Sequence, residues 1–164
     1  MILRHLIFIL IIGLYYSIAE AGQFAVIRVY DGDTLLASGH DITIKVRLVG
    51  IDAPETSKGK RKSGQPFSQA AKKHLSKLVL GKTVDIRGYG LGRYNRVLGV
   101  VFADGVNINL EMIRSGMAEV YRGRPPKSLD MDPYWKAERE AKKRRIGIWS
   151  LKNYISPKEW RAKR

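Results

Sequence analysis

The chain has 164 residues, no cysteine, and 30 lysines and arginines against 15 aspartates and glutamates, so its formal net charge at pH 7 is +15. This length allows one domain with a real hydrophobic core, and the absence of cysteine excludes disulfides. The charge indicates a polyanionic partner. Nucleic acid is favoured because neutralised phosphates release counterions, and an anionic membrane or cell-wall polymer is the alternative.

The first 21 residues have the pattern of a secretory signal peptide. Arg4 supplies a positive start, residues 6–16 are nearly all apolar, and Ala19-Glu20-Ala21 is a small-x-small cleavage site. An uncleaved membrane anchor is the less favoured interpretation, because the run is shorter than the ~20 residues that a bilayer span needs. We therefore expect an exported mature chain that starts at Gly22, either in a periplasm or outside the cell.

Three β-rich segments follow. Residues 24–30 and 34–37 are separated by an acidic turn at 31–33, and from residue 44 to 48 aliphatic side chains alternate with Lys45 and Arg47. The alternation predicts a half-buried strand that carries Arg47 on the face opposite its aliphatic side chains. Residues 47–55 lead from this strand into a second acidic turn.

Two acidic turns bring carboxylates close together in the sequence. Asp33 belongs to the first turn, and Asp52 and Glu55 lie in the second, where Pro54 ends the strand. Turns of this kind, where backbone geometry decides which residue fits, often build sites. We expect these carboxylates to surround one hard cation.

The middle of the chain predicts a basic loop followed by a helix. Residues 57–64 have no apolar side chain and form a basic loop, and Pro66 then opens a helix that Gly81 stops. Its apolar side chains recur at helical spacing: Phe67, Ala70, Ala71, Leu75, Leu78 and Val79. Residues 82–87 and 96–102 read as two more strands around a glycine-rich connection.

Two further helices are expected near the end of the domain. Asn107 or Asn109 can cap a helix that runs to residue 114, and Asp132 is the expected N-cap of a helix with Pro133 in its first turn. A basic extension, residues 151–164, has no assigned role. The sum is an α+β chain with a five-stranded OB-fold β-barrel and three helices over residues 22–150.

Phosphodiester hydrolysis needs a positioned water, a proton acceptor, and positive charge against the phosphate. Asp33 and Asp52 are suitable ligands for Ca²⁺, Glu55 is then free to hold the water, and Arg47 and Arg96 offer planar forks that match phosphate oxygens. Each residue also has an ordinary structural interpretation. An Asp-Gly turn is a common hairpin signal, and an arginine on a strand can be a surface ion-pair partner.

Several motifs occur in a fixed order between residues 24 and 150: VYDGDT, RLVGIDAPE, RYNRVLG, ADGVN, IRSGMA and GIW. In this order and spacing they resemble the thermonuclease (staphylococcal nuclease-like) family. The resemblance implies an OB-fold barrel with three helices. It also implies a Ca²⁺-dependent endonuclease that acts on DNA and RNA and leaves 3′-phosphates.

The resemblance also assigns roles residue by residue. It implies that Asp33 and Asp52 bind Ca²⁺ through their side chains and that Ala53 does so through its main-chain carbonyl. Arg47, Glu55 and Arg96 match the catalytic positions, with Glu55 as the base or water-orienting group and the arginines on the phosphate. The matched substrate contacts are Arg93, Tyr94 and Tyr121.

The chain departs from the family pattern in one turn, where Gly92 replaces a common aspartate and Asn95 replaces a common glycine. The alternative function is a non-catalytic nucleic-acid-binding OB-fold module, since copies of this fold without the carboxylates serve as binding domains. A cationic wall- or membrane-binding protein would explain the charge but not the acidic turns. A monomer is the default expectation.

Overall fold

The computed structural model describes residues 22–57, 59 and 63–163. The expected signal peptide, and residues 58 and 60–62 of the basic loop at 57–64, lie outside the described residues. The strands are β1 Gln23–Val29, β2 Thr34–Gly39, β3 Ile42–Leu48, β4 Ile51–Asp52, β5 Thr83–Leu91, β6 Val97–Ala103, β7 Val106–Asn107 and β8 Glu119–Val120. The helices are α1 Ser68–Val79, α2 Ile108–Arg114, α3 Asp132–Lys143 and α4 Pro157–Ala162, with short 3₁₀ helices at Arg93–Asn95 and Gly147–Ser150.

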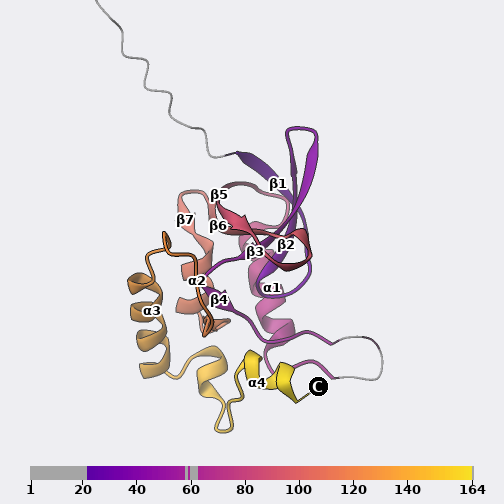
Figure 1. The fold of residues 1–164 in the computed structure, drawn as a ribbon. Helices are drawn as coiled ribbons and strands as arrows, with labels where there is room; N and C mark the ends of the chain where they lie inside the picture. The colour runs from indigo at the N-terminus through magenta and orange to yellow at the C-terminus, as the bar shows by residue number, and fades with distance from the viewer. Residues whose placement is uncertain (1–21, 58, 60–62, 164) are drawn as a thin grey trace, which may run out of the picture.

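A closed barrel forms the centre of the fold (Figure 1). The main sheet has the order β3-β2-β1-β5-β6-β7, and an additional pairing between β3 and β6 closes it. This closing pair is parallel, whereas the other neighbours in the sheet are antiparallel. The structure thus confirms the predicted α+β class and the five-stranded OB-type barrel, to which β7 adds a short edge.

The tight connection between β2 and β3 fixes the register that the site depends on. His40 and Asp41 have φ angles of 52° and 58°, the left-handed pair that a two-residue hairpin turn requires. The hairpin then pairs Leu35 with Val46 and Thr34 with Arg47. Asp33, one residue before β2, is therefore placed beside Arg47 at the end of β3.

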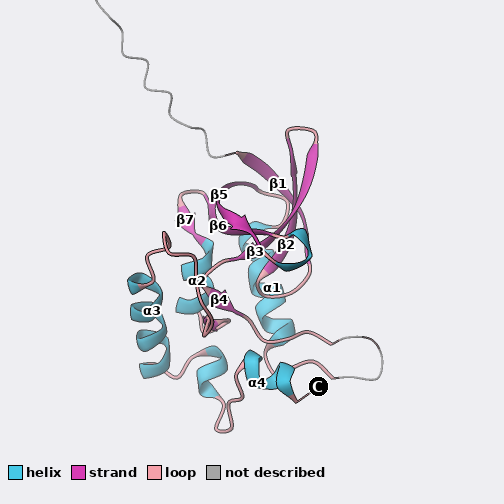
Figure 2. Ribbon diagram, viewed as in Figure 1, coloured by secondary structure: helices cyan, strands magenta, loops and turns pink. Residues whose placement is uncertain are grey.

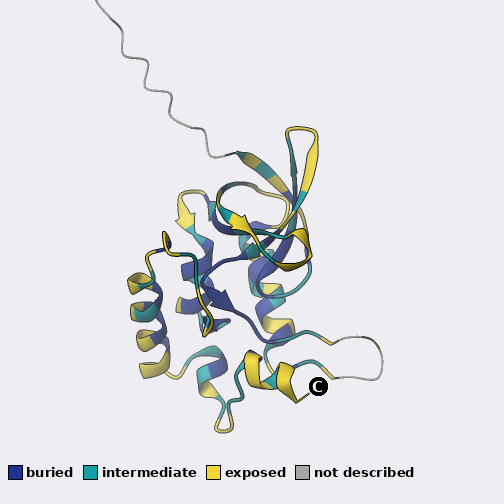
Figure 3. Ribbon diagram, in the orientation of Figure 1, coloured by how far each residue is buried: buried dark blue, intermediate teal, exposed yellow. Residues whose placement is uncertain are grey.

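The core lies inside the barrel and under α1 and α2 (Figures 2 and 3). Helix α1 turns Ser68, Ala71, Leu75 and Val79 inward. Ala70, which the sequence pattern placed on the apolar face, is exposed instead. The α-helix itself starts only at Ser68, because Phe67 has a left-handed φ of 67°.

The ends of α2 and α3 settle two questions about capping. Asn107 caps α2 by accepting a hydrogen bond from the Leu110 N–H. Asn109 is fully buried and instead binds the backbone of β6 and of residue 49. For α3 the N-cap is Met131, so the expectation for Asp132 was wrong by one position; the Asp132 carboxylate lies in the first turn, where the helix dipole favours negative charge.

The C-terminal arm (residues 151–163) folds back onto the domain (Figure 1). It ends in α4, which begins with a capping box between Ser156 and Glu159. The predicted three helices are thus joined by a fourth in a segment for which no structure was expected. Among the described helices, none is long and apolar enough to cross a membrane.

Candidate active site

Arg47 bridges the two acidic turns at the end of β3. Its guanidinium donates to Asp33 Oδ1 at 2.8 Å and to Asp52 Oδ1 at 3.0 Å. Both partners are almost completely buried, and the Arg47 side chain itself is 19% exposed. Burial disfavours the charged form of Arg47, but the two carboxylates hold its pKa above the usual value. Two carboxylates from different turns therefore share one positive group.

Asp33 is the more constrained of these carboxylates. Its Oδ1 also accepts from the Thr34 hydroxyl at 3.0 Å, and its Oδ2 accepts from the Ala53 N–H at 3.0 Å. Burial raises the pKa of Asp33 to about 6, although Arg47 opposes this shift. The hydrogen bond to Ala53 fixes the second acidic turn against the first.

Asp52 lies on β4, which pairs with β8. The register places Asp52 opposite Glu119, and both residues are buried. Burial raises the pKa of Glu119, although a hydrogen bond from the Tyr154 hydroxyl at 2.8 Å opposes the shift. Tyr154 belongs to the C-terminal arm, so the arm reaches the strand pair that carries Asp52.

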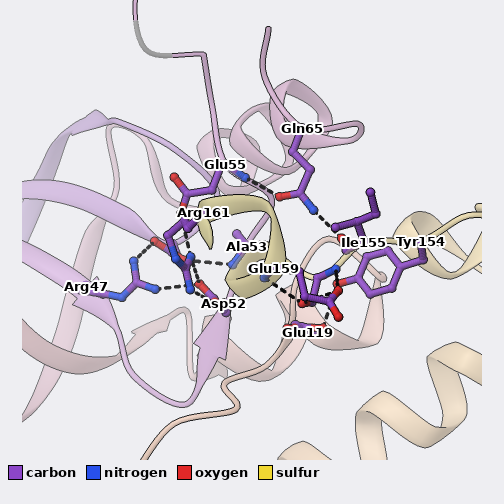
Figure 4. A network of polar contacts seen from close by, with 12 residues as sticks. Arg47, Asp52, Ala53, Glu55, Gln65, Glu119, Tyr154, Ile155, Glu159 and Arg161 are labelled. Carbon is purple, nitrogen blue, oxygen red and sulfur yellow. Dashed lines mark hydrogen bonds and ion pairs between the residues drawn. The ribbon is translucent and has the colours of Figure 1, made fainter. Parts of the chain in front are cut away.

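The backbone of Glu55 is held by Gln65, and its side chain accepts from Arg161. The Glu55 N–H donates to Gln65 Oε1 at 3.1 Å, and the Gln65 N–H donates to the Glu55 carbonyl at 2.8 Å. Gln65 is buried, and its Nε2 donates to the Ile155 carbonyl at 2.6 Å. Sequence reasoning missed Gln65, which positions Glu55 and also contacts the C-terminal arm (Figure 4).

An open cleft of about 630 Å³ lies in front of these groups. Every residue expected at the site lines it except Asp52, which is buried just behind: Asp33, Arg47, Ala53, Glu55, Arg93, Tyr94, Arg96 and Tyr121. The structure therefore brings all the expected residues together in one place. Arg124 also lines the cleft and had not been singled out.

The turn that carries Arg96 has an unusual backbone. Tyr94 and Asn95 have φ angles of 60° and 52°, which glycine adopts freely and asparagine adopts better than most residues. Asn95 can therefore stand where the family commonly has glycine. The Arg96 Nε donates to the Arg93 carbonyl at 3.1 Å, and Tyr94 is 88% exposed at the cleft.

Arg161 of α4 also lines the cleft and contacts two of the expected residues. It donates to Asp52 Oδ1 at 3.0 Å, to Asp52 Oδ2 at 2.7 Å and to Glu55 Oε1 at 2.7 Å (Figure 4). The hydrogen bonds to Asp52 raise the pKa of Arg161, against an opposing effect of burial. Sequence reasoning missed this residue. The sequence Ser156-Pro-Lys-Glu159 has the capping-box pattern that predicts the start of α4, but this pattern does not predict where α4 docks.

The donor set suits a hard cation. Within the described part of the chain, no group of three histidine, cysteine, aspartate or glutamate side chains is arranged to hold a metal ion. Ca²⁺, however, accepts carbonyl and water ligands beside carboxylates. Asp33 and Asp52 lie within reach of the same guanidinium, and Arg161 already places positive charge on Asp52. The two carboxylates are therefore donors of the kind that such an ion prefers, with carbonyl and water oxygens to complete the set.

The comparison with known proteins assigns the chain to a family. A family model described as staphylococcal nuclease homologue matches residues 45–151. The chain belongs to this family. It is 43% identical over 145 residues to an "uncharacterized endonuclease" of Haemophilus influenzae, covering 87% of this chain and 74% of the relative. It is 38% identical over 147 residues to a "micrococcal nuclease" of Shigella flexneri, covering 83% and 78% respectively.

A third relative, an "uncharacterized endonuclease" of Escherichia coli, is 35% identical over 141 residues, which cover 85% of this chain and 84% of the relative. The member of the staphylococcal nuclease family described here is therefore a nuclease, a hydrolase of phosphodiester bonds. The resemblance predicted from the six motifs is confirmed.

Proposed function

We propose that this nuclease is an exported, Ca²⁺-dependent endonuclease that cuts DNA and RNA with little sequence specificity and leaves 3′-phosphates. The observation that carries the proposal is the convergence of Arg47, Glu55 and Arg96 on one cleft backed by Asp33 and Asp52. Nucleic-acid binding alone needs positive charge and stacking surfaces, but not buried carboxylates.

Glu55 is the residue that we assign to the attacking water. Its side chain is 21% exposed at the cleft, while Gln65 fixes its backbone from behind. A carboxylate held in this way can orient a water and receive its proton as the bond to phosphorus forms. Asp33 and Asp52 are too deeply buried for this task.

The arginines are assigned to the phosphate. Arg47 is fixed by its two carboxylates, and the Arg96 guanidinium is anchored through Nε to the Arg93 carbonyl. Preorganised planar donors of this kind stabilise the charge that grows on the phosphate oxygens in the transition state. Asp33, Asp52 and the Ala53 carbonyl would hold Ca²⁺, which would supply further positive charge to the phosphate.

The surroundings of the cleft support a sequence-tolerant substrate. Tyr94 and Tyr121 line it together with Arg93 and Arg124. Aromatic rings stack on any base and arginines bind any phosphate, so these contacts do not select a sequence. The net charge of +15 favours long polyanions, and the pattern of residues 1–21 supports export.

Digestion of plasmid DNA and of RNA by the purified mature chain tests the proposal. We expect cleavage of both with Ca²⁺, internal cuts, ends that carry 3′-phosphate, and no cleavage with excess chelator. Intact DNA and RNA in the presence of Ca²⁺ would contradict nuclease action, and full activity in chelator would contradict the metal requirement. Finding Met1 on the protein recovered from its natural location would contradict removal of the signal peptide.

A further inference from the structure

The side chain of Arg161 binds the carboxylates of Asp52 and Glu55, which the proposed function needs for the cation and the water. Oδ1 of Asp52 accepts from both Arg47 and Arg161, and Oδ2 accepts from Arg161. The Arg161 guanidinium also donates to Oε1 of Glu55 at 2.7 Å. A bidentate pair with a buried carboxylate is among the stronger contacts that an arginine makes. One side chain thus binds both the expected metal ligand and the expected base.

Further contacts outside the cleft hold the arm in this position. The Tyr154 hydroxyl donates to Glu119 at 2.8 Å, and the Tyr154 ring lies 4.8 Å from that of Trp149. Gln65 donates to the Ile155 carbonyl at 2.6 Å. The Ser156 hydroxyl accepts from the Glu159 N–H at 3.2 Å and starts α4 in the direction that delivers Arg161. The arm is therefore docked by specific contacts along its length.

A guanidinium and a divalent cation compete for the same oxygens. Ca²⁺ binds carboxylate oxygen at about 2.3–2.6 Å, whereas a guanidinium nitrogen needs nearly the same space at its hydrogen-bonding distance. The two positive groups also repel each other at this separation. The Asp52 carboxylate therefore cannot bind Ca²⁺ and keep its bidentate pair with Arg161 at the same time.

On this basis, and resting on the function proposed above, we propose that Arg161 is an internal competitor of the divalent cation. Docking of the C-terminal arm and binding of the cation at Asp52 exclude each other. In the docked state the arm also occupies Glu55, so the nuclease is held inactive until the cation displaces Arg161. The arm thereby raises the cation concentration at which the enzyme becomes active.

Ca²⁺ binding measured by calorimetry on the full mature chain tests this competition, with Arg161→Ala as the main variant. We expect the variant to bind Ca²⁺ about fivefold more tightly or better, which is the size of a typical coupling between two binding events. Lys158→Ala is the matched control, because it removes one exposed positive charge from the same helix without touching the carboxylates. Its affinity should equal that of the parent protein.

Ser156→Ala separates release of the arm from loss of charge. It weakens the capping box of α4 and changes no charge, so Ca²⁺ affinity should rise in the same direction as for Arg161→Ala but by less. An unchanged affinity in both Ser156→Ala and Arg161→Ala would overturn the proposal.

Hydrogen exchange on the parent protein gives a readout that needs no variant. Saturating Ca²⁺ should speed exchange of the amides in α4 about fivefold or more. Unchanged or increased protection of α4 would mean that the arm stays docked in the loaded site, and the proposal would be wrong. If instead neither parent nor variants bind Ca²⁺, the metal requirement of the proposed function fails as well, and these outcomes are distinct.

Discussion

Arg47 donates to Asp33 at 2.8 Å although the two residues are 14 positions apart in the sequence. The contact follows from the hairpin register, which pairs Thr34 with Arg47 and so puts Asp33 at the guanidinium. The same side chain reaches Asp52 at 3.0 Å, and Arg47 thereby joins the two acidic turns.

Replacing Arg47 should lower stability as well as activity. In Arg47→Ala the buried carboxylates lose a shared partner, and we expect the free energy of unfolding in chelator to fall by about 2–4 kcal/mol. Arg47→Lys keeps the charge but cannot bridge both carboxylates with one ammonium group. Its free energy of unfolding should therefore lie between those of the parent and of Arg47→Ala. Urea unfolding measures both variants. Arg139→Ala, which removes an exposed arginine of α3, is the control and should stay within about 0.5 kcal/mol of the parent.

Arg96→Lys should separate catalysis from folding. Among the described residues, the Arg96 side chain makes one hydrogen bond, to the Arg93 carbonyl, and its guanidinium lies 5.8 Å from the centre of the Tyr94 ring. The variant should therefore unfold like the parent, while kcat falls by about 10²-fold because the planar fork is lost. Arg93→Lys, the matched neighbour, should mainly raise KM. A kcat for Arg96→Lys within about twofold of the parent would exclude Arg96 from transition-state stabilisation.

Glu138 predicts a pH-dependent part of the stability. This buried carboxylate of α3 accepts from the Val120 N–H at 2.8 Å, from Arg122 at 2.7 Å and from Lys142 at 2.9 Å. Burial alone would raise its pKa, but the hydrogen bonds from Arg122, Lys142 and Val120 outweigh this and lower it. Because the folded-state pKa is depressed, the contribution of Glu138 is present above the unfolded-state pKa and is lost as the pH falls through the folded-state value.

Glu138→Gln should therefore be less stable than the parent by about 2 kcal/mol at pH 7. The difference should shrink as the pH falls below the unfolded-state pKa of glutamate, about 4.3, and should be lost once the pH has passed the depressed folded-state value. Denaturant unfolding at a series of pH values measures this. Glu140→Gln, an exposed neighbour on α3, should show no such difference at any pH. A gap between Glu138→Gln and the parent that stays constant down to pH 3 would contradict the assignment.

Local patterns in the sequence predicted the barrel and most of the cleft. The alternation around Arg47 was enough to define β3, since one face of this strand is buried and the other is not. The residues expected at the site follow strand ends and turns, and a closed barrel brings such ends together at one rim. Family motifs then supplied the roles that geometry alone leaves open.

Residues whose role depends on long-range docking could not be predicted. Both Asn107 and Asn109 are plausible caps in the sequence, and only the burial of Asn109 against β6 separates them. Arg161 is 109 positions from Asp52 and lies on a helix of six residues, so neither periodicity nor motif spacing links the two. A capping box predicts where a short helix starts, but not which surface it packs against.

We propose that Glu55 accepts the proton of the attacking water in this cleft, and Glu55→Gln tests this role most directly. We predict that initial rates of DNA and RNA cleavage at saturating Ca²⁺ fall by about 10²-fold or more, since an amide cannot accept the proton of the attacking water. The unfolding transition should stay that of a folded protein, and Glu140→Gln should cleave at the rate of the parent. A Glu55→Gln variant that cleaves within about twofold of the parent rate would contradict the account.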